Sequence, residues 1–345
     1  MDNYPPSYCI PDVVVLTWRI PTSALLIAFV ALCLVLIAGL RPVGLDRDSL
    51  NYAAVIGSNM GGTFFGNREP TFWLINAISQ RSPFPAITTF FLLYALLGVF
   101  VKTAAILKLS PRPLLSLYLY ITLYFVSHEF TQIRTGIAAG IYLFALHSLS
   151  KGNRGDFLFR LFVATCFHYS AVIGLVMLVS QRFSRSSFRL FALPLIGIAL
   201  SQILTAENIE LLGSYVLPGP IQGRLFLYLE LLSDDRFTQI NLLNPVTTSF
   251  LVLYWLLVLK IPVTARVFDR YLLLSFGVGL ASFYAASVIP VVAFRMMEFL
   301  SVGIVILLAS ATFWFRDKQI WIFLLMLWAL TVFIVQSLIL SLGVF

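Results

Sequence analysis

The sequence predicts an all-α membrane protein, a polytopic bundle of about 10–11 spans with partly helical outer loops. Of the 345 residues, 60% are hydrophobic and 11% are charged, whereas charged residues make up about 25% of an average soluble protein. Apolar runs of roughly 18 or more residues recur, and a helix of that length crosses a hydrocarbon core. No stretch alternates in polarity with the period of a strand, so the spans are expected to be helices.

The expected spans follow one another along the whole chain. The first of them, PTSALLIAFVALCLVLIAGL, is too long for the apolar part of a signal peptide, so we expect it to stay in the membrane. A short helix at 71–80 is expected in addition. The expected spans are 21–40, 86–107, 113–127, 134–150, 157–179, 190–204, 246–263, 271–289, 298–315 and 319–342. Because no internal repeat or polar linker divides the chain, residues 1–345 should form a single transmembrane domain.

The charges of the loops predict the orientation of the bundle, because short cytoplasmic loops retain Lys and Arg. Four loops are rich in cations, namely 151–156, 181–189, 260–270 and 315–319. In contrast, 41–70 balances its cations with acids, and 205–245 holds more acids than cations. We therefore expect outer loops at 41–85 and 205–245, lying over an active site.

One conflict arises in this scheme. The loops 151–156 and 181–189 are both basic, yet a single predicted span, 157–179, separates them. Two interpretations remain open: either 157–179 is a re-entrant or broken element, or one of the basic loops lies on the outer side.

The composition limits the kinds of ligand. Cations retained in cytoplasmic loops account for most of the net charge of +8 without a nucleic-acid partner. Arginine is strongly favoured over lysine among them, and its guanidinium suits bidentate contacts with phosphate. Three cysteines, two of them in apolar runs, suggest neither a disulfide framework nor a zinc site. We expect no metal and no cofactor.

The run HEFTQIRTGIAAG at 128–140 places His128, Glu129 and Arg134 at the start of a span. A charged side chain inside the bilayer costs roughly 2.5–3.5 kcal/mol, so it suggests a function. Gly136 and Gly140 follow, and small residues at this spacing let a neighbouring helix approach closely. A closely packed helix would hold Arg134 in a fixed place. The alternative is an arginine that extends to the lipid headgroups.

His168 lies in the middle of the predicted span 157–179, although a single histidine in a helix often has only a packing role. Arg134 and His168 flank one helical hairpin, so at about 1.5 Å per residue they could line one cavity. Arg295 opens the span at 298–315, where a salt pair with Glu298 is the alternative to a function. Arg224 lies in an amphipathic stretch of the acidic outer loop.

The first outer loop offers two further carboxylates. Asp46 and Asp48 precede Tyr52 at the predicted start of a helix, where an N-cap is their commoner role. Glu69 precedes Pro70 and an aromatic helix. A carboxylate at such a position could take a proton from a sugar hydroxyl, given reach and a suitable pKa.

These segments together resemble the EpsG family of Wzy-like polysaccharide polymerases. The resemblance rests on their order and spacing within a chain of about ten spans, from 41 to about 300. The segments are RPVGLDRDSLNY, EPTFWLINAIS, FTQIRTGIAAGIYLFALHSLSKGN, FLFRLFVATCFHYSAVIGL and AFRMMEF.

The resemblance implies a GT-C-like enzyme of the bacterial inner membrane that works on undecaprenyl-pyrophosphate-linked glycans at the outer face. It would transfer a growing glycan to a hydroxyl of the next lipid-linked repeat unit, without a metal. A chain-length regulator is a further expected partner. The expected ligands of pyrophosphate and glycan are Arg134, Arg295, Arg224, Arg41, His128 and Glu129, and the candidates for the base are Asp46, Glu69 and His168.

Two other classes of protein remain open. A flippase or transporter of lipid-linked glycan would also need an arginine-lined cavity, but such proteins usually contain internal repeats. A different membrane transferase, such as an O-antigen ligase or an acyltransferase, is the second alternative.

Overall fold

The computed structural model describes residues 22–57, 68–216, 226, 229 and 241–341. Within these segments all regular elements are helical, as predicted. The first elements are α1 (Thr22–Gly39), α2 (Arg47–Gly57), α3 (Pro70–Gln80), α4 (Ala86–Leu109), α5 (Pro113–Tyr120), the π-helical η1 (Ile121–Phe125) and η2 (Ser127–Thr131), α6 (Ile133–Ser150) and α7 (Arg154–Phe167). The later ones are the 3₁₀-helical η3 (Tyr169–Leu175), α8 (Val176–Ser180), the 3₁₀-helical η4 (Gln181–Arg185), α9 (Ser187–Ser201), α10 (Ala206–Val216), α12 (Pro245–Lys260), α13 (Val267–Ala285), α14 (Pro290–Ser301), α15 (Ile304–Ala311) and α16 (Lys318–Ser341).

Local sequence explains where several helices begin. Proline opens α3, α5, α12 and α14, where its fixed φ fits the helix and its missing N–H costs no hydrogen bond. The Asn153 side chain caps α7 by accepting a hydrogen bond from the backbone N–H of Asp156 at 3.0 Å.

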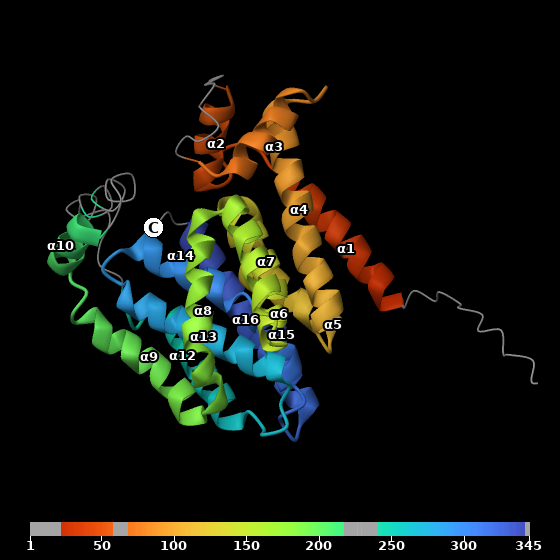
Figure 1. The fold of residues 1–345 in the computed structure, drawn as a ribbon. Coiled ribbons are helices and arrows are strands. Elements are labelled where there is room, and N and C mark those ends of the chain that lie inside the picture. Colours follow the sequence, from red (N-terminus) through yellow and green to blue (C-terminus); the bar gives the residue numbers. More distant parts are fainter. Residues whose placement is uncertain (1–21, 58–67, 217–225, 227–228, 230–240, 342–345) are drawn as a thin grey trace, which may run out of the picture.

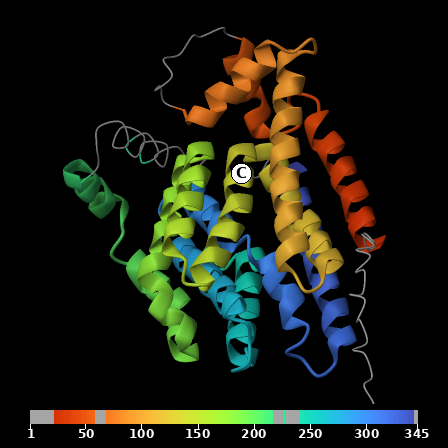
Figure 2. The same ribbon diagram turned by 45° about the vertical axis from the view of Figure 1, so that its right-hand side comes forward.

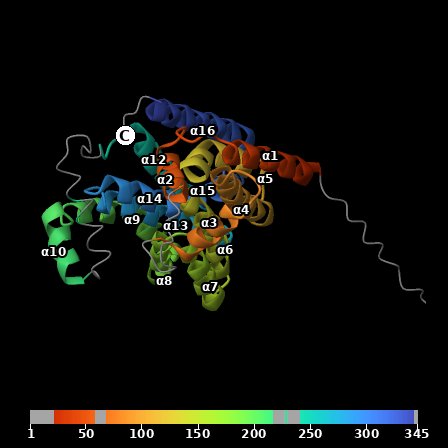
Figure 3. The same ribbon diagram turned by 90° about the horizontal axis from the view of Figure 1, so that it is seen from above.

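The helices form a bundle with two chemically different ends (Figures 1 and 2). The connections α4–α5, α6–α7, η4–α9, α12–α13 and α15–α16 all lie toward one end, which we call the basic end. The loops predicted to be cytoplasmic are among them. Helices α2 and α3 lie at the opposite end, the α3 end. Seen from the α3 end, α16 and α7 lie at opposite margins of the bundle (Figure 3).

An all-α membrane bundle is therefore confirmed, but uninterrupted spans are fewer than expected. By length and composition, two described helices can cross a membrane, Ala86–Leu109 and Lys318–Leu338. The pair α14 and α15, bent by 47°, provides a third if it counts as one span. Several other predicted spans appear as shorter apolar helices, and π-helical turns interrupt the chain between α5 and α6.

The predicted span 157–179 is a broken element, which was the first of the two interpretations. Helix α7 ends at Phe167, His168 is extended (φ −153°, ψ 119°), and η3 and α8 return beside α7. A Cβ atom on Gly174 would lie only 2.7 Å from Cδ1 of Leu161, so the two arms are in close contact. Both basic loops thus lie toward the same end, and His168 occupies the bend of a hairpin instead of the middle of a span.

The predicted close approach around Gly136 and Gly140 is confirmed. A Cβ atom on Gly136 would lie 2.4 Å from the carbonyl oxygen of His128, and one on Gly140 would lie 2.9 Å from Cγ1 of Val101. Helix α6 therefore packs directly against η2 and α4, which fixes its first turn.

Gly136→Ala is expected to lower the stability of the folded protein by about 1–3 kcal/mol, because the new methyl group overlaps backbone that cannot move away. Thermal unfolding in detergent measures this effect. Gly155→Ala is the matched control, since its Cβ atom would meet nothing closer than 3.8 Å. Equal unfolding temperatures for both variants would contradict the close packing of α6.

Candidate active site

Three side chains from distant parts of the sequence meet at the α3 end. Glu69 directly precedes α3, Arg134 lies in the first turn of α6, and His168 forms the bend after α7. Oε2 of Glu69 pairs with Nη1 of Arg134, and Oε1 lies 2.9 Å from Nδ1 of His168. The Glu69 carboxylate, 3% exposed, thereby joins two of the predicted site residues.

The backbone around Glu69 explains this meeting. Because Pro70 follows, Glu69 adopts an extended conformation (φ −65°, ψ 149°). The hydroxyl of Thr71, in the first turn of α3, donates to the carbonyl of Cys166 at 2.7 Å, and the Tyr169 hydroxyl donates to the carbonyl of Arg68 at 3.1 Å. The start of α3 and the α7–η3 bend are thus bound to each other on both sides of His168.

Aromatic rings surround the Arg134 guanidinium. Its Nε donates to the Tyr52 hydroxyl at 3.4 Å, and its Cζ lies 5.8 Å from the centre of the Phe72 ring. Arg68 stacks on the same Phe72 ring at 4.6 Å. Sequence reasoning missed Tyr52 and Arg68 as site residues. The position of Arg68 directly before Glu69-Pro70 was the available signal.

Glu69 and His168 differ in their ability to act as a base. Burial raises the pKa of Glu69, but the hydrogen bond from His168 and the charge of Arg134 outweigh it and lower the pKa to about 2. Such a carboxylate is ionised near neutral pH and is a weak base. Since an ionised carboxylate only accepts hydrogen bonds, Nδ1 of His168 carries the proton and Nε2 is the basic nitrogen.

Arg295 belongs to the same region. Its helix, α14, packs against α6, which carries Arg134, and against η3, which directly follows His168. The alternative, a salt pair between Arg295 and Glu298, is not observed. The Glu298 carboxylate instead accepts a hydrogen bond from Nε2 of Gln132 at 2.5 Å. Helix α14 begins at Pro290, so Arg295 lies in its second turn instead of opening a span.

Asp46 and Arg41 have structural roles. Oδ1 of Asp46 accepts from the backbone N–H of Ser49 at 2.9 Å and of Asp48 at 3.1 Å, while Oδ2 lies 3.0 Å from Nε of Arg41. The buried Arg41 guanidinium also donates to the carbonyl of Phe130 at 2.8 Å. Both side chains are therefore occupied in joining α2 to the end of η2. This geometry does not favour Asp46 as a base or Arg41 as a phosphate ligand. Arg224 lies outside the described residues.

His128 and Glu129 point into the protein instead of toward a sugar site. Glu129, 1% exposed, accepts hydrogen bonds from Nζ of Lys102 at 2.5 Å and from the Tyr120 hydroxyl at 2.8 Å. His128 is fully buried against Tyr124, with a ring distance of 5.1 Å. The π-helical turns of η1 and η2 direct these side chains inward, so the expectation of sugar contacts is not supported.

Lys102→Met is expected to destabilise the protein by about 3–5 kcal/mol, because it leaves the buried charge of Glu129 without its cation. The double variant Lys102→Met, Glu129→Gln removes both charges and should recover much of this loss. Thermal unfolding of both variants provides the test. If the double variant is no more stable than Lys102→Met, the ion pair is not what stabilises this region.

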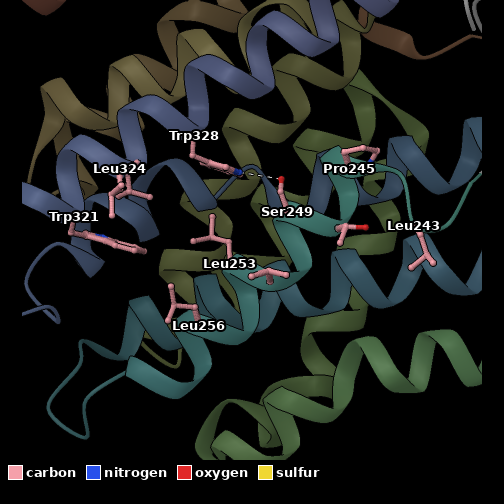
Figure 4. A pocket seen from close by; sticks show the side chains of 11 residues that line it. Leu243, Pro245, Ser249, Leu253, Leu256, Trp321, Leu324 and Trp328 are labelled. Atoms are coloured by element: carbon pink, nitrogen blue, oxygen red, sulfur yellow. Dashed lines mark hydrogen bonds between the residues drawn. The ribbon is translucent and has the colours of Figure 1, made fainter.

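Two other kinds of site are a metal-binding cluster and a cavity. Among the described residues no group of three His, Cys, Asp or Glu side chains could hold a metal ion. A mainly apolar groove of about 480 Å³ lies between α12 and α16, where Nε1 of Trp328 donates to the Ser249 hydroxyl at 3.1 Å (Figure 4). None of the residues that line the groove is charged.

The fold and the cluster define an all-helical membrane protein with two arginines, a carboxylate and a histidine gathered at the end opposite its basic connections. The chain belongs to the EpsG family, whose model it matches over residues 24–343. This confirms the predicted family and makes the chain a polymerase-type glycosyltransferase of polysaccharide biosynthesis. No curated protein and no solved structure matches the chain.

Proposed function

We propose that this protein is a polysaccharide polymerase of the bacterial inner membrane. It transfers a growing glycan from undecaprenyl pyrophosphate to a hydroxyl of a lipid-linked repeat unit at the outer face. The single observation that carries the proposal is the contact of Glu69 with both Arg134 and His168 at the α3 end, away from the basic end.

The chemistry of these residues suits the reaction. The bond between the anomeric carbon and the pyrophosphate oxygen breaks, and negative charge builds on the lipid diphosphate that leaves. Arg134 and Arg295 stabilise this charge, since guanidinium groups already in place need no reorganisation. Nε2 of His168 accepts the proton of the acceptor hydroxyl while the new glycosidic C–O bond forms. Glu69 orients the imidazole and stabilises the imidazolium, as the carboxylate of a triad does.

We further propose that the transfer needs no metal ion, because the arginines take the role that a divalent cation plays at other diphosphates. Treatment with EDTA is expected to leave the rate of the purified protein unchanged. Loss of activity that added Mg²⁺ or Mn²⁺ restores would contradict this expectation.

A cellular experiment separates the proposed polymerase from the alternatives. Loss of a polymerase leaves single repeat units on the final product, whereas loss of a flippase stops surface delivery, and loss of a ligase stops attachment to the final acceptor. In cells that lack this protein we therefore expect single repeat units at the surface. Absence of all surface glycan would contradict the proposal and favour a transporter.

A further inference from the structure

One hydrogen bond connects the helices that carry the two arginines of the site. Gln132, two residues before Arg134, donates from Nε2 to Oε2 of Glu298 at 2.5 Å. Glu298 follows Arg295 by three residues in α14, so both project from neighbouring positions of one helix surface. The contact therefore ties the start of α6 to the turn of α14 that carries Arg295.

The backbone of Gln132 is itself held firmly. Its N–H donates to the carbonyl of Ser127 at 2.7 Å, which closes the last π-helical turn. Its carbonyl accepts from the N–H of Gly136 at 2.8 Å, which opens α6. Gln132 thus occupies the junction of η2 and α6, with a non-helical backbone (φ −98°, ψ 50°). A side chain at such a junction can fix the direction in which α6 leaves.

A second contact joins the end of α14 to η1. The Tyr124 hydroxyl, from η1, lies 3.0 Å from the hydroxyl and 3.0 Å from the carbonyl oxygen of Ser301, at the end of α14. Helix α14 is therefore bonded at Ser301 to Tyr124 of η1 and at Glu298 to Gln132, at the junction of η2 and α6. Movement of Arg295 away from Arg134 would have to break the contact at Glu298.

The two arginines need such a connection because like charges repel. Within the described part of the chain, Arg134 has a carboxylate partner in Glu69, whereas no ion pair involves Arg295. A diphosphate offers oxygens on two phosphorus atoms, and arginine binds such oxygens through parallel N–H donors. Two guanidinium groups at a fixed separation would bind a diphosphate better than each binds a single phosphate.

We propose that the Gln132–Glu298 hydrogen bond holds the start of α6 against α14 so that Arg134 and Arg295 act on one ligand together, and that it thereby favours lipid diphosphates over monophosphates. Gln132 and Glu298 are positioning residues in this scheme and do not touch the substrate. The inference rests on the proposed function and names the residues that determine its specificity for the leaving group.

The test compares inorganic pyrophosphate and inorganic phosphate as ligands of the full-length purified protein, by calorimetric titration. Gln132→Leu removes the donor, and Gln132→Glu places two carboxylates opposite each other. Each is expected to weaken pyrophosphate binding by about tenfold, the value of the one charged hydrogen bond that Arg295 would lose to the second phosphate, with little change for phosphate. The exchange variant Gln132→Glu, Glu298→Gln rebuilds the bond in the reverse direction and should restore the preference for pyrophosphate. Gln202→Leu, at the exposed end of α9, is the matched control.

The outcomes separate the inference from the proposed function. If the wild-type protein binds pyrophosphate no better than phosphate, the proposed function fails together with the inference. If the wild type prefers pyrophosphate and both single variants keep that preference, the inference is overturned and the proposed function stands. Failure of the exchange variant to restore the preference, although it unfolds at the wild-type temperature, overturns it as well.

Discussion

Arg134→Lys is expected to lower the rate of polymer formation by about a hundredfold or more, although the positive charge remains. The ammonium group is a point charge without the planar fork of donors that matches phosphate oxygens. Loss of one donor that stabilises a developing charge costs on the order of 10²–10³ in rate. The measurement is the initial rate of product formation by the purified protein with a lipid-linked repeat unit.

Arg189→Lys is the matched control for this substitution. Arg189 lies near the start of α9, at the basic end, and among the described residues its guanidinium donates only to the carbonyl of Arg182 at 3.3 Å. The control should therefore retain the wild-type rate. If cells that carry Arg134→Ala at normal expression still make polymer of full length, Arg134 has no role in the reaction.

His168→Ala should lower the rate by on the order of 10²–10⁴, the range for loss of a positioned general base. Glu69→Gln should also be severely impaired, because the amide can neither fix the Nδ1–H tautomer as strongly nor pair with the Arg134 charge. The two residues act as a unit. The double variant should therefore be little slower than the slower single variant. Fully additive losses would show that Glu69 and His168 act independently.

The dependence of the rate on pH distinguishes the two groups. Because the pKa of Glu69 is lowered to about 2, its carboxylate stays ionised as the pH falls through the ordinary range of carboxylates. Burial lowers the pKa of His168 below the usual range of histidine, so a loss of activity on the acidic side of that range reports protonation of His168. This acidic limb should be absent from the residual activity of His168→Ala. Its persistence in that variant would contradict the assignment of His168 as the base.

The sequence predicted the main course of the chain, because apolar length and loop charge are local properties. The long helices α4 and α16 match the predicted spans 86–107 and 319–342 closely. Interruptions inside apolar runs were less predictable: the two basic loops left a broken element at 157–179 open as one of two interpretations, and no pattern indicated the π-helical turns before α6. The hairpin at His168 and the π-helical turns before α6 depend on hydrogen bonds to residues far along the chain, such as that of Thr71 to the Cys166 carbonyl.

In the candidate site, the sequence likewise indicated single residues but not the partners that the fold brings to them. Arg134, Glu69 and His168 stood out because polar groups in an apolar chain are costly. Their partners could not be read from spacing: Asp46 turned out to cap α2 and pair with Arg41, and Glu129 to pair with Lys102. Lys102, alone in the apolar run 86–107, was a signal of the second pairing that the sequence analysis did not use.

The most direct test of the central claim is incubation of the purified protein with its lipid-linked repeat unit, with glycan products and released lipid diphosphate measured together. We expect a ladder of products and one lipid diphosphate for each glycosidic bond, with both lost in Arg134→Ala and His168→Ala. A ladder of unchanged length and rate in both variants, or no ladder from the wild-type protein, would contradict the claim that the Glu69–Arg134–His168 cluster is the site of glycan transfer.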